Sequence, residues 1–159
     1  MFRFVPPPPD LRAWVLGGVI LRSDPQLACT RFPALAGAML VVRLAGAVHQ
    51  GQAGGPALPA AAWLTANTGP SVYWHDGPVH AVGLILQPPT AHCWLGTPLH
   101  ALEGSALEAA AVLPPAWRTV EQAVRNAPDD ITRLSCLFGA VRAALGHTSQ
   151  DASVRRLQQ

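Results

Sequence analysis

The distribution of apolar residues divides the chain into two regions. From Val5 to about Leu86, short apolar runs rich in β-branched residues are separated by Gly and Pro, a spacing typical of strands joined by turns. From about Val112 to Gly146, apolar residues recur every three or four positions, which is the period of one face of an α-helix. The sequence therefore predicts a β-rich body followed by helices.

Within the first region, five strands are expected. Four consecutive prolines, Pro6 to Pro9, favour an extended polyproline arm, and this arm leads into a first long strand at residues 14–22. The run from Ala38 to Ala45 is apolar except for Arg43, as expected of a strand that is covered on both faces or lines a barrel. Further strands are predicted near residues 61–65, 72–75 and 79–86, with residues 46–59 as a loop.

The segment His75-Asp-Gly-Pro78 has the composition of a turn and predicts a hairpin between the last two strands. A two-residue loop would place Pro78 where a hydrogen-bond donor is needed. A loop of three or four residues is therefore favoured, and with four residues His75 lies opposite His80 and Trp74 lies opposite Ala81.

Three helices are predicted after residue 86. A short helix is expected at residues 90–95, followed by an irregular stretch to Pro115. A second helix begins at Ala116 and ends before Pro128, since proline cannot continue it. The last helix runs from Asp129-Asp130, whose charges suit a helix N-terminus, to Gly146 as a C-terminal stop, and the polar tail 147–159 is expected to be frayed.

The composition indicates one folded domain. The chain has 159 residues, of which 50% are hydrophobic and 13% charged, so it can bury enough apolar area to offset its ordering entropy. Its eleven basic residues are all Arg and are scattered, against nine acidic residues and a net charge of +2. This balance argues against direct nucleic-acid binding, because a basic stripe is needed to follow phosphates.

Neither targeting signals nor paired cysteines are evident in the sequence. The start of the chain shows no secretory signal, and Gly and Pro interrupt the longest uncharged stretch, Leu44 to His75, so no membrane span is predicted. A cytoplasmic protein is expected. Cys29, Cys93 and Cys136 are too widely spaced for a Cys-x-x-Cys knuckle and are interpreted as reduced thiols.

No catalytic constellation is evident. The serines lack a Gly-x-Ser-x-Gly elbow and the carboxylates are isolated along the sequence, so the chain is not expected to be an enzyme and no cofactor is predicted. None of the six histidines falls at metal-ligand spacing, and no metal site is predicted. A site assembled from His49, His75 and His80 remains an alternative.

Aromatic and polar residues on the predicted strands form the best candidate pocket. The set predicted to bind a ligand is Arg43, Trp63, Trp74 and His80, accompanied by Trp14, Tyr73 and His75. Stacking surfaces beside a few polar groups suit a small-molecule site. The alternative is that these residues belong to the core and rim of a barrel.

Several segments resemble the N-terminal sensor domain of AraC-type transcription regulators. They are the Pro-rich start Phe4-Val-Pro-Pro-Pro-Pro-Asp-Leu11, the early Trp14, the Arg31-Phe-Pro33 step and Val82-Gly-Leu-Ile-Leu-Gln-Pro88, together with the segment 99–113 and two closing helices. The resemblance covers roughly residues 2–146. It implies a cupin-like β-barrel followed by helices that often mediate dimerisation, with a separate C-terminal helix-turn-helix domain that binds DNA.

The resemblance therefore gives the expected organisation. The fold is expected to be α+β, a cupin-like β-barrel followed by two or three C-terminal helices: residues 1–111 form the ligand-sensing barrel with its Pro-rich arm, 112–146 a helical dimerisation segment, and 147–159 a tail or the start of a linker. If the strand 79–86 alternates as in such relatives, Leu84 and Leu86 point inward, and His80 and Val82 lie on the pocket side.

The expected function is effector sensing and dimerisation in a transcription regulator. A small-molecule effector and a second copy of the chain are the expected partners, the helix 129–145 is expected to supply an apolar seam through Leu134, Leu137 and Val141, and DNA would be bound only by a domain beyond Gln159. Two alternatives remain: a free-standing cupin-like metal-dependent enzyme, and an interaction module that uses its helices alone.

Overall fold

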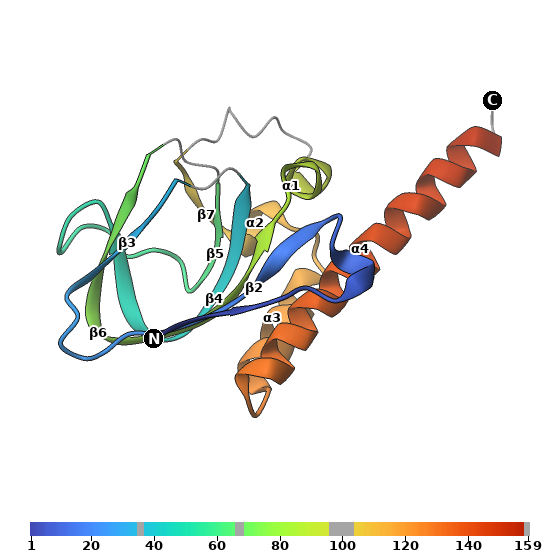
Figure 1. The fold of residues 1–159 in the computed structure, drawn as a ribbon. Coiled ribbons are helices and arrows are strands. Elements are labelled where there is room, and N and C mark those ends of the chain that lie inside the picture. The colour runs from blue at the N-terminus through green and yellow to red at the C-terminus, as the bar shows by residue number, and fades with distance from the viewer. Residues whose placement is uncertain (35–36, 66–68, 96–103, 158–159) are drawn as a thin grey trace.

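An antiparallel sheet of seven strands and four α-helices make up the computed structural model (Figure 1), which describes residues 1–34, 37–65, 69–95 and 104–157. For Cys93, Leu95 and residues 147–157 only the backbone is described. The strands are β1 (Phe2–Val5), β2 (Val15–Arg22), β3 (Cys29–Phe32), β4 (Ala38–Gln50), β5 (Ala61–Leu64), β6 (Ser71–Leu86) and β7 (Ala106–Glu108). The helices are α1 (Pro88–Leu95), α2 (Ala109–Val112), α3 (Trp117–Asn126) and α4 (Asp130–Leu157), with a 3-10 turn at Pro9–Leu11. The α+β class is thus confirmed.

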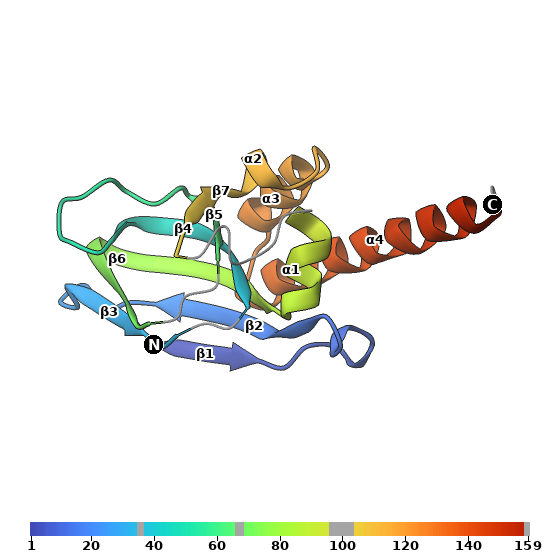
Figure 2. The same cartoon turned by 90° about the horizontal axis from the view of Figure 1, so that it is seen from above.

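The sheet is open. Its strands lie in the order β1-β2-β6-β4-β5-β7, and β3 pairs with the first part of β6. The outermost strands β1 and β7 do not pair with each other, so the expected cupin-like closed barrel is not confirmed. Figure 2 shows the long strands β4 and β6 running side by side, as their register requires, with β2 and β1 beyond them.

The hairpin predicted at His75–Pro78 is wrong. Residues 71–86 form the single strand β6, in which His75 pairs with Val48 and His80 with Ala45, both on β4. Gly77, at φ +76°, and Gly46, at φ +75°, bend the two strands at neighbouring points. A Cβ atom on Gly46 would lie 2.6 Å from the carbonyl oxygen of Pro78, so the bend requires glycine there. The Asp-Gly-Pro sequence therefore forms part of an irregular bend shared by β4 and β6 and does not reverse the chain.

The apolar run that begins at Ala38 alternates between two faces of β4. Leu40 and Val42 are fully buried under the helices, whereas Met39, Val41 and Arg43 face the opposite side of the sheet. Strand β4 also extends to Gln50, into the segment predicted to be a loop. One face of the strand is therefore covered by helices, and the other, half-buried face lines a cavity, so coverage on both faces is not confirmed.

One hydrophobic core joins the sheet to the helices. It contains Leu11, Val15, Ile20, Leu40, Trp63, Val82, Leu84, Leu86, Trp117, Val124, Leu134, Leu137, Phe138 and Val141, among others. Helix α4 lies close to β2, where Gly18 leaves room for Leu134: a Cβ atom on Gly18 would lie 2.9 Å from Leu134 Cδ1. Core residues come from both sides of position 111, so the predicted barrel and helical segments share one core.

The helices follow the sequence pattern with one exception. Helices α1 and α3 confirm the predictions near 90–95 and 116–126, and Asp129 caps α4 by accepting the Thr132 N–H at 2.8 Å. Helix α4, however, continues through Gly146 to Leu157, because Gly146 does not adopt the positive φ of a C-terminal stop. The expected irregular stretch after residue 95 contains β7 and α2, and its part at 96–103 lies outside the described residues.

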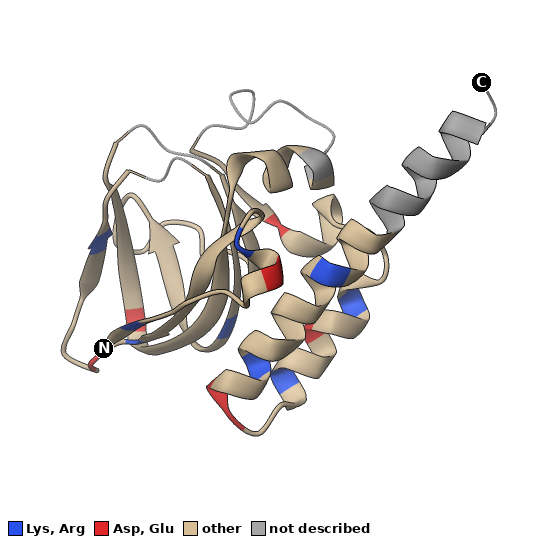
Figure 3. Cartoon of the chain, turned by 45° about the vertical axis from the view of Figure 1, so that its right-hand side comes forward, with Lys and Arg blue, Asp and Glu red and all other residues tan. Residues whose placement is uncertain are grey.

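An ion-pair cluster fastens the start of α4 to the sheet. The Asp130 carboxylate accepts hydrogen bonds of 2.8 Å each from Arg22 on β2, His80 on β6 and Arg133 on α4. Figure 3 shows basic and acidic positions interspersed along the described part of the helices. No helix among the described residues is long and apolar enough to cross a membrane.

Candidate functional site

The face of the sheet opposite the helices encloses a cavity of about 490 Å³. This volume is within the range typical of small-molecule sites. Its described lining comes from β1 to β6 and from the segments at 33–34, 58–59, 65 and 104–105. It consists of Phe2, Val19, Leu21, Thr30, Arg31, Phe32, Pro33, Ala34, Met39, Val41, Arg43, Val48, Gln50, Leu58, Pro59, Ala62, Leu64, Thr65, Ser71, Tyr73, His75, Val79, Ala81, Val82, Ile85, Gly104 and Ser105.

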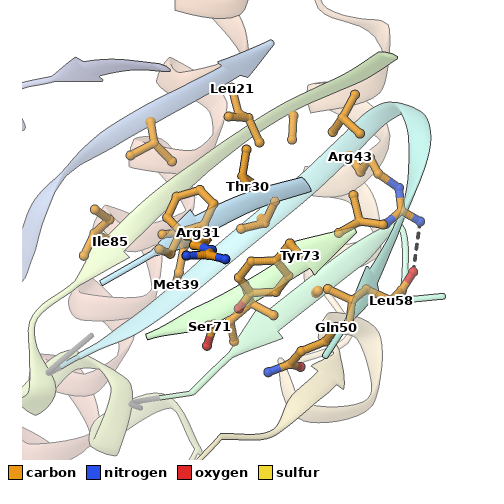
Figure 4. Close-up of a pocket in the computed structure, with 18 of the residues that line it drawn as sticks. Leu21, Thr30, Arg31, Met39, Arg43, Gln50, Leu58, Ser71, Tyr73 and Ile85 are labelled. Carbon is orange, nitrogen blue, oxygen red and sulfur yellow. Dashed lines mark hydrogen bonds between the residues drawn. The ribbon is translucent and has the colours of Figure 1, made fainter. Parts of the chain in front are cut away.

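Strand alternation explains why most of these residues are apolar and face the same way. Side chains two positions apart on a strand share a face, and the cavity accordingly receives Val19 and Leu21 from β2, Met39 and Val41 from β4 and Ala81 from β6. Figure 4 shows these strands carrying their side chains over one face of the sheet. The cavity is therefore largely apolar, and the hydrogen-bonded strands of the sheet form its wall.

The described polar groups in the cavity are few. His75 Nε2 and Thr30 Oγ1 share a hydrogen bond of 3.0 Å, and burial lowers the pKa of His75, so that the ring is neutral at about pH 7. Burial raises the pKa of Tyr73, whose ring packs edge-on against Phe32 at a centroid distance of 5.6 Å. These groups supply hydrogen bonds and an aromatic surface without adding charge.

Arg43 supplies charge to the cavity. Its Nη2 atom donates to the Leu58 carbonyl oxygen at 2.9 Å (Figure 4). Burial, and then the positive charge of Arg125, lowers the pKa of Arg43. None of the carboxylates in the described ranges forms an ion pair with Arg43, whereas Arg22, Arg125, Arg133 and Arg142 all have such partners.

Comparisons of the chain with protein-family models, curated proteins and solved structures gave no match. The resemblance to AraC-type sensor domains consequently stays a prediction, and the arrangement of the cavity itself has to support any functional proposal.

The four residues predicted to bind a ligand are not brought together. Arg43 lines the cavity, whereas Trp63 is fully buried on the helical side, 5.8 Å from Trp94 between ring centroids. Trp74 donates from Nε1 to the Gly51 carbonyl at 3.2 Å, and His80 bonds Asp130. Neither residue lines the cavity.

For His80, the reason is the direction in which the side chains of β6 alternate. Leu84 and Leu86 do point inward, but into the core beneath the helices. His80 has the same parity on the strand and bonds Asp130 on that side. Val82, predicted with it to lie on the pocket side, does line the cavity, together with Val79, Ala81 and Ile85. Both faces of β6 are apolar, so the sequence alone does not show which set faces the ligand side.

The three residues predicted for dimerisation lie in the core of the protomer. Leu134 is 1% exposed, and Leu137 and Val141 are fully buried, against the sheet and the other helices. They cannot form an apolar seam with a second copy while this core is intact.

The histidines of the metal-enzyme alternative lie apart from one another. His75 faces the cavity, His49 bonds the Asp76 carboxylate and His80 bonds Asp130. Within the ranges that the structure describes, no three His, Cys, Asp or Glu side chains are grouped to hold a metal ion.

Sequence reasoning missed most of the cavity wall. Met39 and Val41 share the parity of Arg43 on β4, and Ala81 and Ile85 lie opposite this set: Arg43 pairs with Ala81 and Met39 with Ile85. A charged residue in an otherwise apolar strand can be used to find the other residues of its face, because side chains at i±2 point to the same side of the sheet.

Proposed function

We propose that this chain is the effector-sensing domain of a transcription regulator of the AraC type, binding a small, mainly apolar molecule in the cavity. The observation that carries the proposal is the cavity of about 490 Å³ lined by the face of the sheet opposite the helices. A sheet that is buried on one face by helices and hollowed on the other leaves room for a ligand, which supports the proposal.

The proposal includes a distant relationship to cupin-like barrels, supported by the long strands β4 and β6 and by the helices that follow them. It also includes a homodimer. Because Leu134, Leu137 and Val141 are buried within the chain, the dimer interface would use other residues, such as the exposed Ile131 near the start of α4.

A direct contact connects the cavity with the helical layer. Arg125 on α3 donates from Nη1 to the backbone carbonyl of Arg43 at 3.0 Å, and the same guanidinium forms an ion pair with Glu121 at 2.7 Å. A ligand that displaces β4 near Arg43 would therefore also change the position of α3. This contact supports coupling between the cavity and α3, and such coupling is what a sensor domain needs to transmit binding.

Binding is tested with a neutral apolar fluorescent probe, N-phenylnaphthylamine, titrated against the purified chain. Wild type is expected to bind the probe saturably. The variant Ala81→Phe places a ring in the cavity and is expected to lose binding while keeping its circular dichroism spectrum. Ala123→Phe, at an exposed position on α3, is the matched control and should bind like wild type. A wild-type chain that does not bind the probe, or an Ala81→Phe variant that binds it unchanged, contradicts the proposal.

The proposed role in transcription regulation is tested by reading the gene sequence beyond the codon for Gln159. A reading frame that continues past Gln159 into a helix-turn-helix supports the proposal, and a stop codon at that point counts against it. In a longer protein, ligand-dependent DNA binding measured by fluorescence anisotropy should be lost in Ala81→Phe and retained in Ala123→Phe.

A further inference from the structure

Within the described ranges, Arg43 is a cation with few hydrogen-bonding partners. A hydrogen bond to the Leu58 carbonyl orients its guanidinium, and the positive charge of Arg125 also acts on it. An arginine has more N–H donors than this one bond uses. This half-buried guanidinium pairs with no carboxylate of the described residues, and removing a charge from water is costly unless the charge is paired.

The rest of the described lining also favours a negatively charged ligand. It contains Arg43 and Arg31 but neither Asp nor Glu, and His75 is neutral at about pH 7 because burial lowers its pKa. The charge that the described lining presents to a ligand is therefore positive. Arg31 is exposed to solvent, so Arg43 is the cation that gains most from a ligand.

The position of Arg43 also determines the shape of the ligand. Met39 lies four residues before Arg43 on β4 and pairs with Ile85 on β6, which places this apolar end about 13 Å from Arg43 at the rise of a strand. Figure 4 shows Arg43 at one end of the labelled side chains and Ile85 at the other. Arg31 is drawn between them, beside Met39. Arg43 thus marks one end of the cavity, and the apolar side chains of Met39 and Ile85 lie toward the other.

We infer that the effector is a small apolar carboxylic acid, whose carboxylate binds Arg43 and whose body lies along β4 and β6 toward Met39 and Ile85. This inference rests on the proposed sensing function. A planar guanidinium matches a carboxylate in two parallel hydrogen bonds, and one such cation balances one negative charge. A phosphate ester would call for more charged partners than Arg43 supplies.

The test compares matched acids and amides. Decanoic acid and naphthoic acid, each with its primary amide, compete with N-phenylnaphthylamine at about pH 7, so that each pair differs mainly in charge. We expect each acid to bind about 10- to 100-fold more tightly than its amide, the range expected from hydrogen bonds to a charged group. In Arg43→Gln this preference should fall to nearly one, and Arg43→Lys should retain part of it. The off-site control Arg12→Gln should retain all of it.

The outcomes separate the two proposals. If the probe binds wild type but acids and amides compete equally, or no acid competes, the carboxylate inference is overturned while a sensing cavity stands. A preference lost in Arg31→Gln instead of Arg43→Gln overturns the assignment to Arg43. If the probe does not bind at all, the sensing function itself fails. Circular dichroism and urea unfolding of each variant exclude loss of the fold as the cause.

Discussion

Replacing Leu137 by Ala distinguishes a core residue from an interface residue. The side chain is fully buried in the layer between α4 and the sheet. Removing its three outer carbons forfeits about 2.4 kcal/mol of transfer free energy at about 0.8 kcal/mol per carbon. The cavity left behind raises the expected cost to about 3–5 kcal/mol, a large share of the roughly 5–15 kcal/mol by which domains are stable.

Urea unfolding followed by circular dichroism measures this loss. The unfolding midpoint should fall with an unchanged slope, and the melting temperature should drop by about 6–20 °C, at about 2–4 °C per kcal/mol for a chain of this size. Ser135→Ala, at an exposed position on the same helix, is the control and should cost less than about 1 kcal/mol.

The result that would refute the reasoning is specific. If Leu137→Ala leaves the unfolding midpoint unchanged and instead converts a dimer to a monomer in sedimentation, the side chain lies in an interface between copies. The same result would restore the apolar seam predicted from the sequence.

Further predictions concern charge and backbone. Burial opposes ionisation of Asp130, but hydrogen bonds from Arg22, Arg133 and His80 outweigh it and lower the pKa below 3.8. Asp130→Asn should therefore cost about 1–3 kcal/mol at neutral pH. The difference from wild type, measured by urea unfolding, should vanish as pH falls below about 3.8 through the folded pKa. Hydrogen bonds to Asp76 and to a backbone carbonyl raise the pKa of His49 above 6.5. The stability that they contribute is complete below pH 6.5 and is lost as pH rises through the folded pKa, so wild type and His49→Gln should differ most at low pH and converge at higher pH. An NMR titration midpoint of His49 below 6.5 would contradict this prediction. Gly46→Ala should lower stability by more than about 1 kcal/mol because of its positive φ and close approach, whereas Gly139→Ala, in open space on α4, should raise the melting temperature through about 0.5–1 kcal/mol of stabilisation.

Much of the secondary structure follows from local pattern. The apolar run at Ala38, the proline before α3 and the Asp129 cap of α4 each act within a few residues, and all three are found where the sequence places them. Strands β1, β3 and β7 are not predicted from the sequence: each is three or four residues long, too short to show a period of its own, and none is an unbroken apolar run as β5 is. They form because a longer strand supplies the hydrogen-bond partners.

The hairpin and the last helix show where local signals mislead. Asp-Gly-Pro favours a turn in isolation, but Gly46 on β4 provides a matching bend, and pairing the two strands along their whole length satisfies more backbone groups. Gly146 is a good helix stop, yet the cost of a glycine within a helix is only about 1 kcal/mol, and α4 passes through it.

By itself, the sequence determined that this chain is an α+β protein with a β-rich body before its helices, and that Arg43 lies alone in an apolar strand. Only the tertiary structure decided which face of each strand is hollow, because β4 and β6 are apolar on both faces and alternation fixes parity but not direction. The helices settle it: they cover the face of Leu40, Trp63 and Leu84, which leaves Arg43 and its neighbours to line the cavity.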